Sequence, residues 1–407
     1  MAEKSESKMR IMSIVGARPN FMKVAAISRA IEDHNAAGGA CPIEHTIVHT
    51  GQHYDKRMSA LFFEELEIPK PHINLGVGSL SHAVQTAQIM EGFEPVLLRE
   101  RPDVMLVVGD VNSTVACALV ASKVEYNGSG KGRRPCIGHV EAGLRSFDRS
   151  MPEEINRTLT DALSDLLFTT EEDAMVNLER EGIPRGKVYF VGNVMIDTLL
   201  RHLEMAKRSD ILRQLGLRSV AAHGSCSTKD DYCVLTLHRP SNVDDEETFR
   251  GILDALIGIS KQVPILFPCH PRTRANIHRF GLEDYFNFNG SDQHSKVEKR
   301  RILSLEPLGY IDFLALLSDA KLVFTDSGGL QEETTALGIP CITLRENTER
   351  PVTISDGTNH LVGTKREKII ETALSLLNGR GRRGSVPPLW DGKAGRRILD
   401  ILIQNVK

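Results

Sequence analysis

The sequence VMLVVGDVNST occupies residues 104–114 and joins an apolar run to a Gly-Asp turn and the start of a helical pattern. The run Val104–Val108 is apolar on both faces, as is typical of a parallel strand covered by helices on both sides. The amphipathic stretch Ser113–Val124 follows directly. This order of strand, turn and helix predicts one unit of an α/β sheet.

The same order repeats along most of the chain, with helical stretches such as Val24–Glu32 and Glu246–Ile259 between short apolar runs. The other candidate strands are Arg10–Val15, His45–Thr50, Cys136–Val140, Leu166–Thr169, Val188–Val191, Tyr232–Leu237, Pro264–Pro268, Leu322–Phe324, Cys341–Leu344 and His360–Val362. We therefore predict an α/β protein with two Rossmann-like, doubly wound parallel-sheet domains that face a cleft. Ligands of such sheets bind outside the carboxyl ends of the strands.

A stretch without periodicity, Arg208–Asp231, separates the two series of strands. We place a hinge near Asn193–Asp231, an N-terminal domain at residues 1–195 and a C-terminal domain at residues 196–389. The last helical segment, residues 390–407, follows the Pro387-Pro388 break. One possible position for this helix is against the first domain.

Composition excludes several classes of protein. Of the 407 residues, 41% are hydrophobic and 25% charged, and the net charge of −3 argues against a strongly basic nucleic-acid binder or a polybasic membrane-surface protein. No run approaches 18 apolar residues, and the charged first residues do not resemble a signal peptide. The 7 cysteines are scattered without a CxxC pair, which predicts a reducing, cytoplasmic environment and no zinc cluster.

Basic residues follow the first strand. The segment Gly16–Lys23, GARPNFMK, places Arg18 before the helix-opening Pro19 and Lys23 one turn into the helix. A helix N-terminus with two cations is suited to a diphosphate, and the alternative is a helix start with solvated charges.

Acidic residues follow later strands of the same half. Asp110 follows Val104–Val108, Glu141 follows Cys136–Val140, and Glu153 and Glu154 begin a helix. Clustered carboxyl groups at one sheet edge suit general acid–base chemistry. Asp110 could instead cap a helix, and the acids at 153 and 154 favour a first helical turn, whereas Glu141 has no capping role to fill.

In the second half, His238 follows a strand and is suited to proton transfer near neutral pH. The segment Ser327–Glu333, SGGLQEE, predicts an anion cradle at Gly328 and Gly329, with Glu333 one turn inside the helix to accept ribose hydroxyls. A Ser cap with its box acid is the alternative, but that acid comes three residues after the cap, which this spacing does not match. Arg350 offers a further cation.

Taken together, these segments resemble the non-hydrolysing UDP-N-acetylglucosamine 2-epimerase family over roughly residues 10–380. The blocks that carry the resemblance are GARP at 16–19, TGQHYD at 50–55, GD at 109–110, HVEAGLR at 139–145, PEEINR at 152–157, TDSGG at 325–329 and TERP at 348–351. The resemblance implies two domains of the glycosyltransferase-B type and reversible conversion of UDP-GlcNAc to UDP-ManNAc. It also implies elimination of UDP to give 2-acetamidoglucal, followed by readdition, with no cofactor and no metal.

The resemblance also implies roles for single residues. Asp110, Glu141 and Glu153 are acid–base candidates, and His238 contacts the diphosphate or assists its departure. The other substrate contacts that the resemblance implies are Arg18, Lys23, Leu308, Phe313, Ser327, Gly328, Gly329, Glu333 and Arg350, with the apolar pair at 308 and 313 packing the uracil. A homodimer is implied by the family alone, and neither nucleic acid nor a membrane is an expected partner.

One departure from the family pattern concerns activation by a second substrate molecule. Gln52 and His53 match the family, but Tyr54-Asp55 and the segment Gly76–Ser79 do not, so the resemblance does not carry this activation to the chain.

Three other functions compete with the epimerase. A hydrolysing epimerase would release free ManNAc, a retaining glycosyltransferase would not need three acids on one sheet edge, and a nucleotide-sugar sensor would bind without turnover. We expect the two domains to close around a UDP-sugar, because a reactive glycal must be kept from water.

Overall fold

The computed structural model describes residues 8–39, 41–51, 66–67, 69–126, 133–218, 231–288, 301–382 and 384–406, excluding the side chain of Arg18. The Gln52–Asp55 block considered above lies outside these residues, as do residues 219–230 of the stretch Arg208–Asp231. The chain divides into two compact units, residues 1–198 with 388–407 and residues 199–387.

Each unit is built on a seven-stranded sheet whose strand pairs are all parallel. The strands of the first sheet are β1 (Met9–Val15), β2 (Ile43–His49), β3 (Ile73–Asn74), β4 (Val104–Val108), β5 (Cys136–Val140), β6 (Leu166–Thr169) and β7 (Val188–Phe190). The strands of the second sheet are β8 (Cys233–Thr236), β9 (Ile265–Pro268), β10 (Phe286–Phe288), β11 (Ile302–Leu305), β12 (Leu322–Thr325), β13 (Cys341–Thr343) and β14 (Asn359–Leu361).

Helices connect the strands. Those of the first unit are α1 (Arg18–Ala36), α3 (His82–Glu100), α4 (Asn112–Lys123), α5 (Pro152–Leu163), α6 (Glu172–Arg180) and α16 (Ala394–Asn405), and α7 (Val194–Ala206) crosses into the second. The second unit contains α8 (Ile211–Gln214), α9 (Pro240–Val243), α10 (Glu246–Ser260), α11 (Pro271–Arg279), α12 (Tyr310–Ser318), α13 (Gly328–Leu337), α14 (Val352–Ser355) and α15 (Arg366–Leu377). The turns η1 (Arg185–Lys187) and η2 (Glu283–Tyr285) are 3-10 helices.

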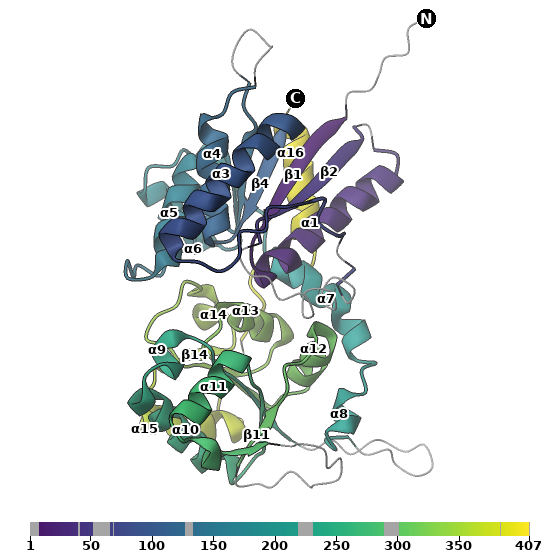
Figure 1. Cartoon of the computed structure of the whole chain (residues 1–407). Helices are drawn as coiled ribbons and strands as arrows, with labels where there is room; N and C mark the ends of the chain where they lie inside the picture. The colour runs from purple at the N-terminus through teal and green to yellow at the C-terminus, as the bar shows by residue number, and fades with distance from the viewer. Residues whose placement is uncertain are drawn as a thin grey trace, which may run out of the picture. The chain divides into compact units, whose positions relative to one another are not determined.

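In the first unit, the strand order β3-β2-β1-β4-β5-β6-β7 reverses direction between β1 and β4. β4 is buried along its whole length. The helices α3, α4 and α5 pack side by side, and α1 and α16 pack together as a separate pair (Figure 1). The carboxyl ends of β1 and β4 therefore form the switch point at which doubly wound sheets bind ligands.

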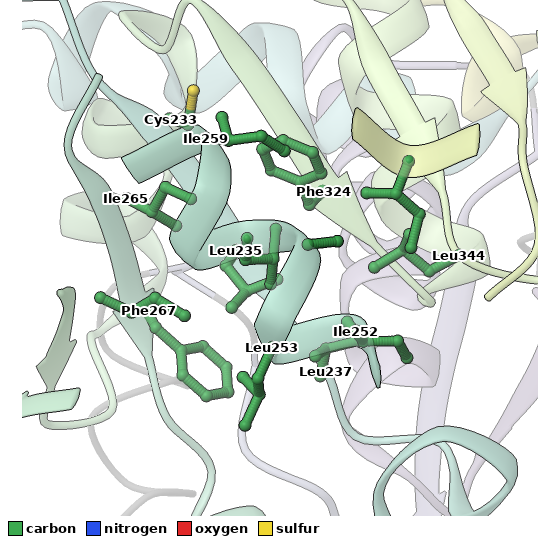
Figure 2. Packing of buried hydrophobic residues seen from close by; sticks show 14 of the residues in the cluster. Cys233, Leu235, Leu237, Ile252, Leu253, Ile259, Ile265, Phe267, Phe324 and Leu344 are labelled. Carbon is green, nitrogen blue, oxygen red and sulfur yellow. The ribbon is translucent and has the colours of Figure 1, made fainter. Parts of the chain in front are cut away.

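The second unit repeats this plan with the order β10-β11-β9-β8-β12-β13-β14, which reverses between β8 and β12. Its core lies between the sheet and the paired helices α10 and α15. Figure 2 shows Leu235 of β8, Leu253 of α10, Phe267 of β9 and Phe324 of β12 in this hydrophobic cluster. The switch point here lies at the ends of β8 and β12.

The C-terminal helix α16 packs on α1 of the first unit (Figure 1). The carboxylate of Asp197 accepts hydrogen bonds from the backbone N–H groups of Ala394 and Gly395 at 3.1 and 2.7 Å, which satisfies the start of the helix. The indole N–H of Trp390 donates to the carbonyl of Thr170 at 2.9 Å. These contacts fix the returning segment to the first unit.

The predicted fold class, two Rossmann-like parallel-sheet units, is confirmed. The sequence analysis missed three short strands, β3, β10 and β11. β3 has 2 residues and β10 has 3, so neither is long enough to show a period. Among the described residues, no helix is both long and apolar enough to cross a membrane.

Candidate active site

The turn after β1 is fixed to the end of β4 by Asn20. Its side-chain oxygen accepts the N–H groups of Gly16 and Ala17 at 3.1 and 2.9 Å, and its amide donates to the carbonyl of Val108 at 2.9 Å. Asn20 therefore fixes the turn that leads into α1, and Pro19 lies in the first turn of this helix, as expected. Arg18 begins α1, and the position of its side chain lies outside the description.

Lys23 lies one turn into α1 and forms an ion pair with Glu141, and both side chains are buried. Gly109 separates them from β4: a Cβ added there would lie 2.9 Å from Lys23 Nζ and 3.4 Å from Glu141 Oε2. Gly109 also has a φ of +67°, so glycine satisfies both the backbone and the close approach. Two predicted site residues, 118 positions apart, thus meet over the switch point.

Glu141 adopts a φ of +74°, a left-handed conformation that is unusual for a residue with a side chain. Its N–H and that of Ala142 both donate to the carbonyl of Phe168 at 3.0 Å, which holds the turn at the end of β5. Strained backbone of this kind gathers at functional sites, where the surrounding structure maintains it.

A buried polar network lies beneath this turn. The ring of His139 contacts Asp161 through Nδ1 at 2.6 Å and the carbonyl of Gly109 through Nε2 at 2.9 Å. Asp161 also accepts from the N–H of Gly143 and from Arg145, at 3.1 and 2.7 Å. Burial pushes the pKa of Asp161 upward, but His139 and Arg145 outweigh it and hold that pKa below its usual range. The network ties the ends of β4 and β5 to α5.

Asp110, the first predicted acid, lies directly after Gly109 and is held by α5. Arg157 donates to Asp110 Oδ2 from Nε at 2.9 Å and from Nη2 at 2.6 Å. The third nitrogen of Arg157 donates to Glu154 at 2.8 Å. Val111, not Asp110, is the cap residue of α4, so the capping alternative for Asp110 is excluded.

The two neighbouring acids of α5 have different surroundings. Glu154 is buried and accepts from the N–H groups of Ser146 and Phe147, both at 2.9 Å, so it organises the loop before α5. Glu153 is half-buried in the first turn and has no hydrogen-bond or ion-pair partner among the residues with a described position. Glu153 is therefore the acid of this pair that is available to a ligand.

At the switch point of the second sheet, His238 follows β8 and meets Asp326, which follows β12. His238 Nδ1 lies 2.9 Å from Asp326 Oδ1, and the N–H groups of His238 and Arg239 donate to Asp326 Oδ2 at 3.0 and 2.9 Å. Asp326 is fully buried, whereas the side chain of His238 is half-exposed. Burial raises the pKa of Asp326, but His238 and the backbone donors bring it below its usual range.

The segment after Asp326 opens α13. Ser327 is the cap residue, yet its side chain makes no capping hydrogen bond, so the capping alternative fails in geometry as well as in spacing. Gly328 and Gly329 form the first turn, and a Cβ on Gly328 would lie 2.6 Å from Glu349 Oε1. A ten-residue helix therefore begins at the switch point with two glycines in its first turn, and a helix N-terminus of this kind is suited to phosphate.

Arg350 lies beside this turn within a buried set of ion pairs. Its guanidinium contacts Glu332 and Glu349, each at 2.6 Å. Glu349 also accepts from Arg345 at 2.9 Å and lies 3.8 Å from a nitrogen of Arg239. The predicted cation is thus held in place before any ligand arrives.

Glu333 is buried in α13 next to Glu332. Burial, reinforced by the charge of Glu332, raises the pKa of Glu333 to about 8. A carboxyl group in this state is protonated at neutral pH and can both donate and accept hydrogen bonds.

The predicted uracil contacts lie after β11. Leu308 belongs to the connection between β11 and α12, Phe313 lies in the first half of α12, and both are half-buried. α12 packs on α13, so Phe313 belongs to a helix that adjoins the helix of Glu333, and Leu308 lies just before its start.

Comparisons with known proteins show which family the chain belongs to. The family model for UDP-N-acetylglucosamine 2-epimerase matches residues 37–403. The UDP-N-acetylglucosamine 2-epimerase of Methanocaldococcus jannaschii is 43% identical over 396 residues, which cover 97% of this chain and 99% of that protein. The chain belongs to the UDP-N-acetylglucosamine 2-epimerase family.

Solved structures extend the comparison. The epimerase of Methanocaldococcus jannaschii in complex with UDP-GlcNAc and UDP matches with a TM-score of 0.81 and 41% identity, covering 98% of this chain and 100% of that one. A UDP-2,3-diacetamido-2,3-dideoxy-D-glucuronate 2-epimerase of Pseudomonas aeruginosa is 38% identical over 97% of this chain and 99% of its own length. A lipopolysaccharide outer core galactosyltransferase, at 12% identity and a TM-score of 0.51, shares only the fold. The protein is therefore an epimerase.

The sequence reading missed the residues that hold the candidates of this epimerase in place. Arg157 binds Asp110 and Asp326 binds His238, although both lie inside segments that the sequence had marked. The sequence feature that could have identified Arg157 and Asp326 is their position in those segments, near the ends of strands. Within the described residues, no group of three or more His, Cys, Asp or Glu side chains is arranged to hold a metal ion.

Proposed function

We propose that this epimerase interconverts UDP-GlcNAc and UDP-ManNAc by eliminating UDP to form 2-acetamidoglucal and adding it back. The hydrogen on carbon 2 is not acidified by a neighbouring carbonyl group, so its removal needs the departure of the leaving group. A base takes the proton, the electron pair forms the double bond between carbons 1 and 2, and the bond from carbon 1 to oxygen breaks. Inversion then requires that a proton return to the opposite face.

The carboxyl groups at the first switch point are the acid–base candidates. Asp110 follows β4 and Glu141 follows β5, and Glu153 begins α5. Arg157 orients Asp110 through an ion pair, and Lys23 does the same for Glu141. We assign proton transfer at carbon 2 to this set, and assign Arg18 and Lys23 as cations on the phosphate and sugar side.

The second switch point supplies groups suited to UDP. Ser327, Gly328 and Gly329 begin α13, where backbone amides favour a diphosphate, and Arg350 adds a fixed positive charge. We assign His238 to the diphosphate. Glu333 would bind the ribose, and Leu308 with Phe313 would pack the uracil.

The observation that carries the proposal is the difference in chemistry between the two switch points. Carboxyl groups gather at the first, and a helix N-terminus with cations lies at the second. Elimination of UDP needs both at once, because one group must remove a proton while others accept the charge of the diphosphate. We infer that the first unit supplies acid–base groups and the second binds UDP, with both contacting one substrate molecule.

The test is incubation of the purified protein with UDP-GlcNAc in heavy water, followed by mass spectrometry and proton NMR. We expect UDP-ManNAc with one deuterium at carbon 2. Product without label at carbon 2 would refute the elimination mechanism, and free ManNAc with UDP would indicate a hydrolysing enzyme instead.

A second substrate follows from the relative in Pseudomonas aeruginosa, whose substrate carries a second acetamido group and a carboxylate. That sugar undergoes the same inversion at carbon 2, so the residue assignments above would stay unchanged. A direct competition between UDP-GlcNAc and the diacetamido glucuronate, compared by kcat/KM, decides which of the two the site prefers.

Two further assignments have narrower support. We infer a homodimer from the family resemblance alone, which sedimentation velocity would test. We place the enzyme in the cytoplasm because its 7 cysteines are scattered and odd in number.

A further inference from the structure

We propose that Asp326 is a positioning residue that keeps a hydrogen on Nδ1 of His238, so that Nε2 is the ring nitrogen that exchanges a proton with the diphosphate. This inference rests on the proposed function for the identity of the proton acceptor. Asp326 itself contacts His238 and the surrounding turn, and acts on the substrate only through the ring.

The hydrogen-bond geometry around Asp326 decides where the hydrogen lies. Oδ1 is 2.9 Å from His238 Nδ1, while Oδ2 accepts the backbone N–H groups of His238 and Arg239 at 3.0 and 2.9 Å. The amide of Asn242 donates to Oδ2 as well, at 3.3 Å. A carboxylate surrounded by donors is stabilised in its charged form and only accepts, so Nδ1 must be the donor in the contact with His238.

The two partners differ in burial, so only the histidine can reach a ligand. The side chain of Asp326 is 0% exposed and that of His238 is 52% exposed. No residue within the described ranges forms a hydrogen bond with Nε2 of His238, so this nitrogen is available to a ligand at the switch point. A buried carboxylate behind a histidine fixes the tautomer and stabilises the ring when it carries both protons.

The proton balance of the elimination follows from this arrangement. When the bond from carbon 1 to oxygen breaks, its electron pair stays on the diphosphate oxygen, which gains negative charge. The doubly protonated ring transfers the hydrogen of Nε2 to that oxygen and keeps the hydrogen of Nδ1 on the side of Asp326. On readdition, the proton returns from the diphosphate to Nε2 and the ring is restored.

A purely structural role for Asp326 is the competing explanation, because it also anchors the turn that contains Arg239 and Asn242. The two roles differ in what happens when Nε2 is removed. If Asp326 acts through the ring, its replacement matters for turnover only while Nε2 is present. If it only anchors the turn, the loss of turnover is the same in both backgrounds.

The experiment is a double-mutant cycle of Asp326→Asn with His238→Asn, in which the second variant keeps a side-chain donor near Asp326 but has no Nε2. In the wild-type background, we expect Asp326→Asn to lower kcat about 100-fold or more, since its amide turns a donor toward Nδ1. KM, and the affinity for UDP by calorimetry, should change less than about threefold, because Asp326 acts on the substrate only through the ring of His238 and the free energy of one weak hydrogen bond bounds the change. In the His238→Asn background, kcat should also change less than threefold, and equal losses in both backgrounds would overturn the proposal.

A second measurement is made on the wild-type chain and does not depend on how fast the variants turn over. Nitrogen NMR of histidine-labelled protein, with His238 assigned from the His238→Asn spectrum, reports which ring nitrogen carries hydrogen. We expect a hydrogen on Nδ1 with and without UDP, whereas a neutral ring with its hydrogen on Nε2 would refute the proposal. This readout involves no substrate, so failure of the enzyme to epimerise UDP-GlcNAc would count against the proposed function and leave the tautomer result standing.

Discussion

At the scale of single residues, Glu333 is buried beside another acid, Glu332. Because its pKa rises to about 8 in the folded protein, the wild type holds a proton there that the unfolded chain releases above about pH 4.5. The folded state therefore loses stability as the pH rises from about 4.5 to 8, and the loss is complete above the folded pKa.

Replacing Glu333 with Gln keeps the shape of the protonated acid and removes this loss. At pH 9 we expect Glu333→Gln to exceed wild type by about 2–5 kcal/mol in free energy of unfolding, and therefore to unfold at a higher temperature. At pH 4.5 the two proteins should unfold at nearly the same temperature. Thermal unfolding at both pH values is the measurement, with the exposed Glu371→Gln as the matched control. A stability difference that does not grow with pH would contradict the raised pKa.

Arg157 is the residue that sequence reasoning left out and that orients Asp110. Its two bonds to one carboxylate oxygen need a planar guanidinium, and a third nitrogen binds Glu154 at the same time. We expect Arg157→Lys to lower kcat about 10- to 100-fold, as part of the contribution of a positioned acid or base, with little change in UDP affinity. Steady-state kinetics with the exposed Arg180→Lys as control would test this, and an equal effect in both variants would remove Arg157 from the site.

At the scale of elements, α16 joins the first unit by a close helix contact. A Cβ on Gly395 would lie 2.7 Å from the backbone carbonyl oxygen of Ala26 in α1, so the two helices can approach only because this position is glycine. The neighbouring amide bonds to Asp197 fix the start of the helix at the same place. The contact has no local sequence signal, because it depends on a partner helix far away in the chain.

We expect Gly395→Ala to lower the free energy of unfolding by about 1–3 kcal/mol, the cost of overpacking a fitted contact. Gly251 in α10 provides the matched control, since a Cβ there meets nothing within 4 Å. Gly251→Ala should raise stability by about 0.5–1 kcal/mol through helix propensity. Denaturant unfolding of the two variants should give shifts of opposite sign, and a neutral Gly395→Ala would show that the helices separate readily.

At the scale of the whole molecule, the proposed reaction requires groups from both units. The boundary between the units crosses α7 at Thr198 and the chain returns at Pro387-Pro388, so two connections join them. The sequence reading placed a hinge near Asn193–Asp231, and a UDP-sugar that contacts both switch points would draw the units together about such a hinge.

Small-angle scattering tests this closure. We expect the radius of gyration to fall when UDP-GlcNAc is added to wild type, and to fall less in the Arg350→Ala variant, in which the proposed diphosphate contact is lost. An unchanged radius at saturating ligand would contradict closure, and it would leave the chemistry at each switch point untouched.

The sequence by itself determined the fold class and the polar segments that follow the strands at the two switch points. Apolar runs such as Val104–Val108 report burial on both faces through their own composition, and polar residues directly after them must lie at the carboxyl edge of a parallel sheet. Asp110, Glu141 and Ser327 could be selected in this way because the signal is local.

Only the tertiary structure decided how these segments meet. Lys23 pairs with Glu141 across 118 positions and His238 bonds to Asp326 across 88, and these partners follow from the order of strands in each sheet. The same holds for Arg350, which the sequence offered as a cation and which the fold encloses between two glutamates. Local pattern depends on neighbours along the chain, whereas the partner of a buried charge depends on which strands and helices are adjacent in space.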